Sequence, residues 1–136
     1  MAVFNIDLIM DMLDWNQPKE IQNQGRRMAR ELKCINVFLQ PCHKGCNKNV
    51  WDNCALILSE RKDEELEPYL CKLLSWLQDL NWPGAEIIME RMEKYKKTQM
   101  FVWALRECME DARKLDDENW HNNLLELIWK RSHRLE

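Results

Sequence analysis

The stretch that decides the fold is LEPYLCKLLSWLQDLNWPGAEIIMERMEKY, residues 66–95. Leucines recur at helical spacing up to Leu77, a turn follows at Asn81-Trp82-Pro83, and a second amphipathic segment comes after the turn. This order predicts an antiparallel helix pair. A pair of this kind buries its apolar stripe only against neighbouring pairs, so the stretch predicts a helical-repeat architecture for the whole chain.

The composition also favours helices. The 136 residues include only three Gly and are rich in Leu, Met, Glu, Lys and Arg, which lose little side-chain freedom in a helix. Hydrophobic residues make up 46% and charged residues 32%, enough for both a core and a solvated surface. We therefore expect a single all-α domain over residues 1–136, without a metal or disulfide to hold it together.

Apolar periodicity predicts about seven helices, arranged in antiparallel pairs that form a short α-α superhelix. They are expected near residues 6–13, 18–32, 48–59, 64–77, 82–92, 99–112 and 116–134. The expected N-caps are Asn5, Asp63, Asn81 and Thr98. Residues 6–29 and 70–92 share an order of parts, which indicates a weak internal repeat with corresponding turns at 14–16 and 79–82.

Charge and segment patterns exclude several classes of protein. The net charge of −3, spread evenly along the chain, argues against a general nucleic-acid binder, which would need a basic surface. The N-terminus carries Asp7, Asp11 and Asp14 where a signal peptide would need a basic start. No apolar run reaches the length of a membrane span. We expect a cytoplasmic protein without membrane contact, whose six cysteines are reduced thiols.

Metal and catalytic signatures are weak. Cys42, His43, Cys46 and Cys54 are residue types that zinc prefers, but their spacing lacks the two C-x2-4-C pairs of a structural zinc site. The three serines lie outside a nucleophile motif, and the glycines stand too far apart to form a phosphate-binding loop. We expect no catalytic residue, no metal site and no cofactor.

The candidate contact residues are acidic and aromatic. Asp7, Asp11 and Asp14 recur at i, i+4 and i+7, so their carboxylates share one face of the first helix. A solvated face explains such a row, and so does a ridge that binds a basic partner. The turns add aromatic anchors. Together the expected partner-binding residues are Asp7, Asp11, Asp14, Trp15, Asn81 and Trp82.

Two segments carry a family resemblance: NVWDNCA, residues 49–55, and WLQDLNWPGA, residues 76–85. With them the sequence resembles a bacterial family of unknown function built from HEAT-like helical repeats, and Asp-x-Asn-Trp-Pro-Gly-Ala at 79–85 is the most specific element. The resemblance covers most of the chain. It implies an α-α superhelical fold and carries over no catalytic residue.

Three functions remain open at this point. Some small HEAT-like proteins look like antidotes encoded beside secreted bacterial toxins, so the resemblance implies toxin immunity as one form of a non-catalytic protein-binding module. An acidic protein suits a basic toxin domain as its partner. HEAT-like folds also include DNA glycosylases, for which Arg26, Arg27 and Arg30 with a carboxylate such as Asp52 would be the candidate residues. A scaffold subunit or homo-oligomer is the third possibility.

Overall fold

A computed structural model describes residues 5–42 and 47–134, and all regular structure in these two ranges is helical. The prediction of an all-α fold is confirmed. The α-helices are α1 (Ile6–Met12), α2 (Lys19–Arg30), α3 (Trp51–Ser59), α4 (Asp63–Leu66), α5 (Leu70–Ser75), α6 (Ala85–Glu93), α7 (Thr98–Lys114) and α8 (Glu118–His133). Short 3-10 turns are η1 (Asn36–Phe38), η2 (Gln40–Cys42), η3 (Lys48–Val50), η4 (Glu67–Tyr69) and η5 (Trp76–Gln78).

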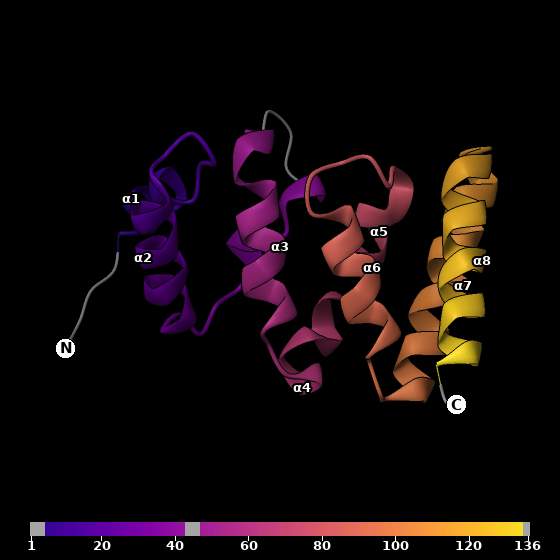
Figure 1. Cartoon of the computed structure of the whole chain (residues 1–136). Coiled ribbons are helices and arrows are strands. Elements are labelled where there is room, and N and C mark those ends of the chain that lie inside the picture. The colour runs from indigo at the N-terminus through magenta and orange to yellow at the C-terminus, as the bar shows by residue number, and fades with distance from the viewer. Residues whose placement is uncertain (1–4, 43–46, 135–136) are drawn as a thin grey trace.

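The helices form a row of antiparallel pairs that follows the chain from one end to the other (Figure 1). Helices α2, α3, α6 and α8 run parallel and each packs against the next, while α1, α5 and α7 return in the opposite direction behind them. The pair α1–α2 opens the row and the pair α7–α8 closes it. Short 3-10 turns take the place of a helix behind α3, where η1 packs against α3 and η2 against α5.

The fourth expected helix is divided into α4, η4, α5 and η5. Pro68 lies at the start of η4, where its missing N–H prevents a continuous α-helix, so the expectation of one helix over 64–77 was wrong. Asn5 caps α1 as expected, with its side chain accepting from the Asp7 and Leu8 N–H groups. The other expected N-caps were wrong, because α4, α6 and α7 are preceded by Lys62, Gly84 and Lys97.

One apolar core runs along the row between the two sets of helices. Trp76, Tyr95, Phe38 and Phe101 are its largest fully buried side chains. Trp76 is held in place by a hydrogen bond from its Nε1 to the Pro83 carbonyl at 2.9 Å. Ile6, Val102 and Ile128 belong to the apolar helical pattern of the sequence but are each 37% exposed.

At one edge of the row, an Asp or Asn side chain accepts a backbone hydrogen bond before each of the parallel helices. Asp14 Oδ1 accepts from the Asn16 N–H at 2.8 Å, and Asp79 Oδ1 accepts from the Asn81 N–H at 2.8 Å. Asn47 accepts from Asn49 in the same way before α3, and Asp117 accepts from the Trp120 N–H before α8. Asx turns of this kind preset the backbone for a helix start. Asx-x-Asn therefore precedes all four parallel helices, as an Asx turn before α2, α3 and α6 and as an N-cap before α8.

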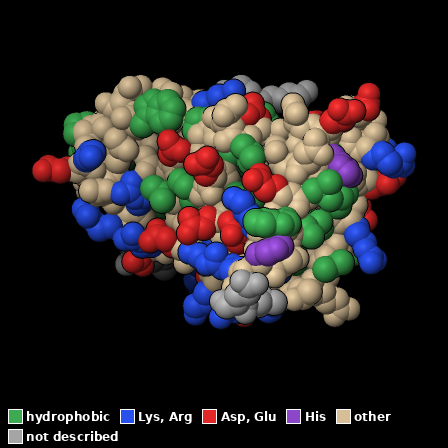
Figure 2. Space-filling model, turned by 45° about the vertical axis from the view of Figure 1, so that its right-hand side comes forward, with side chains coloured by type: hydrophobic (Ala, Val, Ile, Leu, Met, Phe, Trp, Pro, Cys, Tyr) green, Lys and Arg blue, Asp and Glu red, His purple; other side chains and the backbone are tan. Residues whose placement is uncertain are grey.

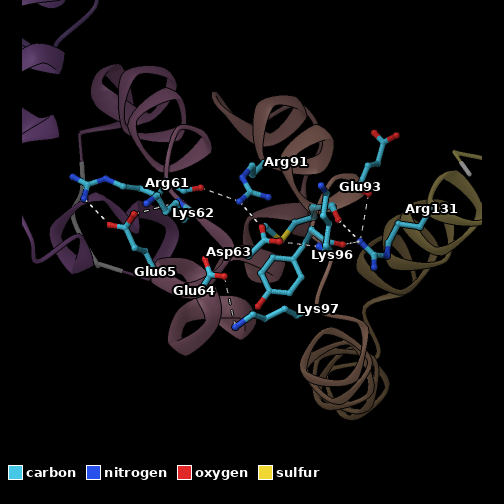
Figure 3. Close-up of polar contacts among 12 residues, drawn as sticks. Arg61, Lys62, Asp63, Glu64, Glu65, Arg91, Glu93, Lys96, Lys97 and Arg131 are labelled. Atoms are coloured by element: carbon cyan, nitrogen blue, oxygen red, sulfur yellow. Dashed lines mark hydrogen bonds and ion pairs between the residues drawn. The ribbon is translucent and has the colours of Figure 1, made fainter.

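The opposite edge is held by arginines (Figure 3). Arg61 donates to the Ala29 and Leu32 carbonyls at the end of α2, and Arg91 donates to the Arg61 carbonyl just beyond α3. Arg131 on α8 donates to the Met92 and Tyr95 carbonyls at the end of α6, both at 2.7 Å. The carbonyl groups at a helix C-terminus lack partners within the helix and attract cations. Each arginine thus joins one parallel helix to the next.

Candidate functional site

The turns before α2, α3 and α6 lie along one edge of the row, which we call the turn edge and define as residues 14–17, 47–51 and 79–84 (Figure 1). The segment 47–51 connects the other two turns. Asn47 Nδ2 donates to Asp14 Oδ2 at 2.9 Å, and the Trp15 N–H donates to the Asn49 carbonyl at 3.0 Å. On its other side, the Lys48 ammonium and Trp51 contact Trp82. The structure therefore brings Asp14, Trp15, Asn81 and Trp82 to one edge.

Trp15 is the exposed aromatic residue of the turn edge. Its side chain is 45% exposed, although both of its backbone polar groups are bonded. The N–H is held by Asn49, and the carbonyl accepts from Gln22 Nε2 at 3.2 Å. A large apolar ring is thus presented to solvent from a fixed backbone, the arrangement of a good interface anchor.

Trp82 has a more structural setting than Trp15. It is half-buried and meets Trp51 edge to face, with the ring centroids 5.6 Å apart and an interplanar angle of 84°. Lys48 Nζ lies 5.5 Å from the Trp51 centroid and 5.8 Å from the Trp82 centroid, within cation–π range. Asn81 is exposed beside them, with its N–H bonded to Asp79. Trp82 therefore packs against the segment 47–51 that leads into α3, and its side chain remains partly exposed.

The three aspartates differ in their surroundings. Asp7 and Asp11 are exposed on α1, and in the described part of the chain no basic group lies within ion-pair distance of either. Asp14 is half-buried, and hydrogen bonds from the Asn16 N–H and the Asn47 side chain lower the pKa of its carboxyl. Asp11 and Asp14 also line a shallow depression of about 430 Å³ with Met10, Asn16, Gln17 and Asn47. Asp14 therefore shapes the edge, while Asp7 and Asp11 remain available for a partner.

A metal site among the described residues would need several Asp, Glu, His or Cys side chains close together. None of the Asp, Glu, His and Cys side chains described at 5–41 and 47–134 form a group of three that could hold a metal ion. His43 and Cys46, and the side chain of Cys42, lie outside the described part, and Cys54 is buried in the core. Burial raises the pKa of the Cys71 and Cys108 thiols, which opposes thiolate formation.

The basic cluster on α2 is largely occupied by neighbouring polar groups. Arg26 hydrogen-bonds to Asn53 and Asn23, and Arg30 pairs with Glu60 at 2.9 Å. Arg27 is exposed. Two of the three guanidinium groups proposed for a DNA-binding role thus make structural contacts within the row.

Sequence reasoning missed the segment that joins the turns. Asn47, Lys48 and Asn49 had been assigned to a loop end and a helix start, yet they bind both neighbouring turns. The recurrence of Asx-x-Asn at 14, 47, 79 and 117 was the available signal. Asn53 was also missed; it is 3% exposed and donates to the Leu13 carbonyl at 2.7 Å and to Gln22. No sequence pattern marked that contact.

A known family model matches most of the chain. The model of a family described as Domain of unknown function (DUF5071) matches residues 46–135. No curated protein and no solved structure matches the chain. The matched region contains α3 to α8, and therefore Asn81 and Trp82, whereas Asp7, Asp11, Asp14 and Trp15 precede it. Across the described residues, no helix has the length and apolar content that crossing a membrane requires.

Proposed function

The chain belongs to this DUF5071 family, and we propose that it is a non-catalytic protein-binding module that contacts a basic partner through the turn edge and the exposed face of α1. The fold proposed for it is a short HEAT-like superhelix. The parallel order of α2, α3, α6 and α8, with one turn type at one edge and arginines at the other, supports that assignment.

The observation that carries the proposal is the exposure of Trp15 on a bonded backbone, on the same helix pair as carboxylates that have no basic partner among the described residues. An aromatic side chain that is already positioned loses little conformational freedom on binding, so more of its burial contributes to affinity. Asp7 and Asp11 supply negative charge at the rim, which steers a basic partner during encounter. Trp15 thus gives the face an apolar anchor, and the two aspartates give it negative charge.

Toxin immunity is the specific role that we propose for this module. A protein that neutralises a toxin must cover a surface that is functional in the toxin, and a basic toxin domain would complement the α1 face. The proposed setting is the bacterial cytoplasm, where the antidote would be made beside its toxin. The partner to test first is the product of the adjacent gene.

The test reverses charge on α1 and compares it with the same change elsewhere. Asp7→Lys with Asp11→Lys should slow association with the copurified partner, more strongly at low salt than at high salt, because exposed charges are screened. Glu107→Lys with Asp111→Lys is the matched control, since these residues are also exposed, acidic and four apart on α7. Trp15→Ala should mainly speed dissociation. Equal effects of the two charge reversals would reject the α1 face as the contact.

The enzyme alternative is tested separately. A DNA glycosylase needs a basic surface for the phosphate backbone, and the contacts of Arg26 and Arg30 within the row favour the binding module instead. Release of alkylated bases from DNA by the purified protein, lost in Asp52→Asn, would replace the binding proposal with the enzymatic one.

A further inference from the structure

Two cysteine thiols from different helices lie against each other inside the row. Cys71 belongs to α5 and Cys108 to α7, and these two helices pack together. The Cys108 thiol donates to the Cys71 carbonyl at 3.6 Å, and the two side chains are also hydrogen-bonded to each other. Both cysteines are free thiols in the structure. We call them the α5–α7 thiol pair.

Small side chains on α7 surround the pair. Ala104, Cys108 and Ala112 recur at a spacing of four residues, so they share one face of α7, and each is 1% exposed. A disulfide requires two Cα atoms within about 7 Å, a distance that bulky side chains between two helices would prevent. The contact at Cys108 therefore has the close packing that a disulfide between helices requires.

The two thiols differ in exposure and in acidity. Cys71 is partly exposed, whereas Cys108 is buried. Burial raises the pKa of both thiols; the hydrogen bond donated by Cys108 partly offsets this rise for Cys71, whereas it raises the pKa of Cys108 further. The carboxylates of Glu107 and Asp111 on α7 also raise the pKa of Cys71. Because the thiolate is the nucleophile, a reagent in solution reacts first with Cys71.

The surface at this end of the row carries charges of both signs. Glu107 and Asp111 are exposed on α7. In Figure 2, where the α7–α8 end comes forward, acidic and basic side chains are interspersed. This end therefore presents no surface of a single sign to a charged reagent on the face that Figure 2 shows.

We propose that the α5–α7 thiol pair is an oxidation site, at which a low-molecular-weight disulfide such as oxidised glutathione converts the two thiols into a Cys71–Cys108 disulfide. The Cys71 thiolate attacks one sulfur of oxidised glutathione, the bond between its two sulfurs breaks, and one glutathione leaves and takes up a proton. The Cys108 thiol then loses its proton, and its sulfur attacks the Cys71 sulfur. The second glutathione leaves with that proton, so two protein thiols are oxidised and one oxidised glutathione is reduced to two glutathione molecules.

The position of the pair favours the second step. The two thiols are already in contact, so the attack needs no second encounter with the reagent and has a high effective concentration. In a reducing cytosol the pair remains as thiols, and the disulfide forms when the surrounding glutathione becomes oxidised. The bond would join α5 to α7 and restrict the unfolded chain, which stabilises the folded row. This inference goes beyond the function proposed for the turn edge and does not depend on it.

The test maps the thiols of the full chain after equilibration in glutathione buffers of increasing oxidised fraction. Trypsin cuts after Lys and Arg, so Cys71 falls in the peptide 63–72 and Cys108 in the peptide 107–113, each with a single cysteine. After the remaining free thiols are alkylated, mass spectrometry should find these peptides as one species, with their summed mass less two hydrogens. Treatment with a reductant should separate them.

Substitutions then test the order of the two steps. Cys108→Ala should leave Cys71 carrying glutathione, because no second thiol displaces it. Cys34→Ala is the matched control, since Cys34 is an exposed thiol, and this variant should form the linked peptide as wild type does. Oxidation should raise the urea midpoint of wild type and of Cys34→Ala but not that of Cys108→Ala.

Three outcomes of the wild-type map would each overturn the proposal. They are recovery of both peptides with alkylated cysteines in buffers that attach glutathione to Cys34, stable glutathione on Cys71, and pairing of Cys71 with a different cysteine. The linked peptide is measured in wild type, so the result does not depend on whether the variants fold. Circular dichroism shows that the oxidised chain keeps its helices.

Discussion

Replacing Gly84 by alanine should destabilise the protein more than most single substitutions. Gly84 precedes α6 with a φ of 83°, a left-handed conformation that costs a residue with a Cβ about 1–2 kcal/mol. The added Cβ would also lie 2.8 Å from both the Ala55 Cβ and the Trp51 carbonyl oxygen, and 3.0 Å from Trp76 Cζ2. Crowding of this kind in a packed core costs about 1–3 kcal/mol. Together the two effects predict a loss of about 2–5 kcal/mol in the free energy of unfolding.

Urea unfolding followed by tryptophan fluorescence and circular dichroism measures this loss. The midpoint of Gly84→Ala should fall by roughly 1–2 M, if the slope is that of a small domain. Gly84→Asn separates the two causes, since Asn tolerates the left-handed conformation but still carries a Cβ. Gly84→Ala made in an Ala55→Gly background should cost less than Gly84→Ala in wild type, because the contact with the Ala55 Cβ is removed.

The result that would refute this reasoning is a Gly84→Ala midpoint equal to that of wild type. It would mean that the turn at 79–84 can move away from α3 at little cost. An equal loss for Gly84→Ala with and without Ala55→Gly would refute only the crowding argument. The backbone argument would then carry the whole effect.

Three further predictions use other parts of the row. Trp76→Ala should cost roughly 3–5 kcal/mol in urea unfolding, because the ring is fully buried and bonded to Pro83; a loss below about 1 kcal/mol would contradict its place in the core. Burial alone would raise the pKa of Asp63, but hydrogen bonds from the Lys96 N–H and from Arg91 outweigh it and lower that pKa below 3.8. The ionised Asp63 carboxylate therefore stabilises the fold above about pH 4, and this stabilisation is lost as the pH falls through the lowered pKa. Asp63→Asn should have a smaller free energy of unfolding than wild type at neutral pH, and that free energy should fall less on acidification. Metal analysis of the purified chain should find no zinc; one zinc per chain, with unfolding on chelation, would show that the Cys42–Cys54 segment binds metal after all.

The sequence allowed the fold to be predicted where apolar spacing is regular. The helices near 18–32, 99–112 and 116–134 correspond to α2, α7 and α8, because each has a continuous buried stripe and a separate solvated face. A proline is tolerated in the first turn of a helix, but the residues before Pro68 already form α4, so the proline interrupts a helical run instead of opening one. The apolar spacing of Val102 and Ile128 is that of inward-facing residues, yet each side chain is 37% exposed in the structure.

The candidate site was predicted in part. Asp14 and Asn81 were chosen for a partner, and the structure places them in Asx turns, a role that the repeated Asx-x-Asn pattern could have indicated. Trp15 and Trp82 lie in corresponding turns but at different positions of the turn, so one ring is exposed and the other packs on Trp51. The Asx-x-Asn pattern marks the turn at 47–49, but its contacts with the two neighbouring turns depend on the packing of α2, α3 and α6.

The family match covers α3 to α8 but not the α1–α2 pair. The matched residues 46–135 contain the Trp51–Trp82 contact, Gly84 and the arginines Arg61, Arg91 and Arg131, which together hold α3, α6 and α8 in register. These contacts hold neighbouring helices of the row together. Asp7, Asp11 and Trp15 lie on the helix pair before the match, fixed to the row through Asn47, Asn49 and Asn53. We therefore expect substitutions on α1 and in its turn to change which partner binds while the row stays folded. Replacing Asp7 and Asp11 by lysine should alter association rates but should change the free energy of unfolding by no more than about 0.5 kcal/mol.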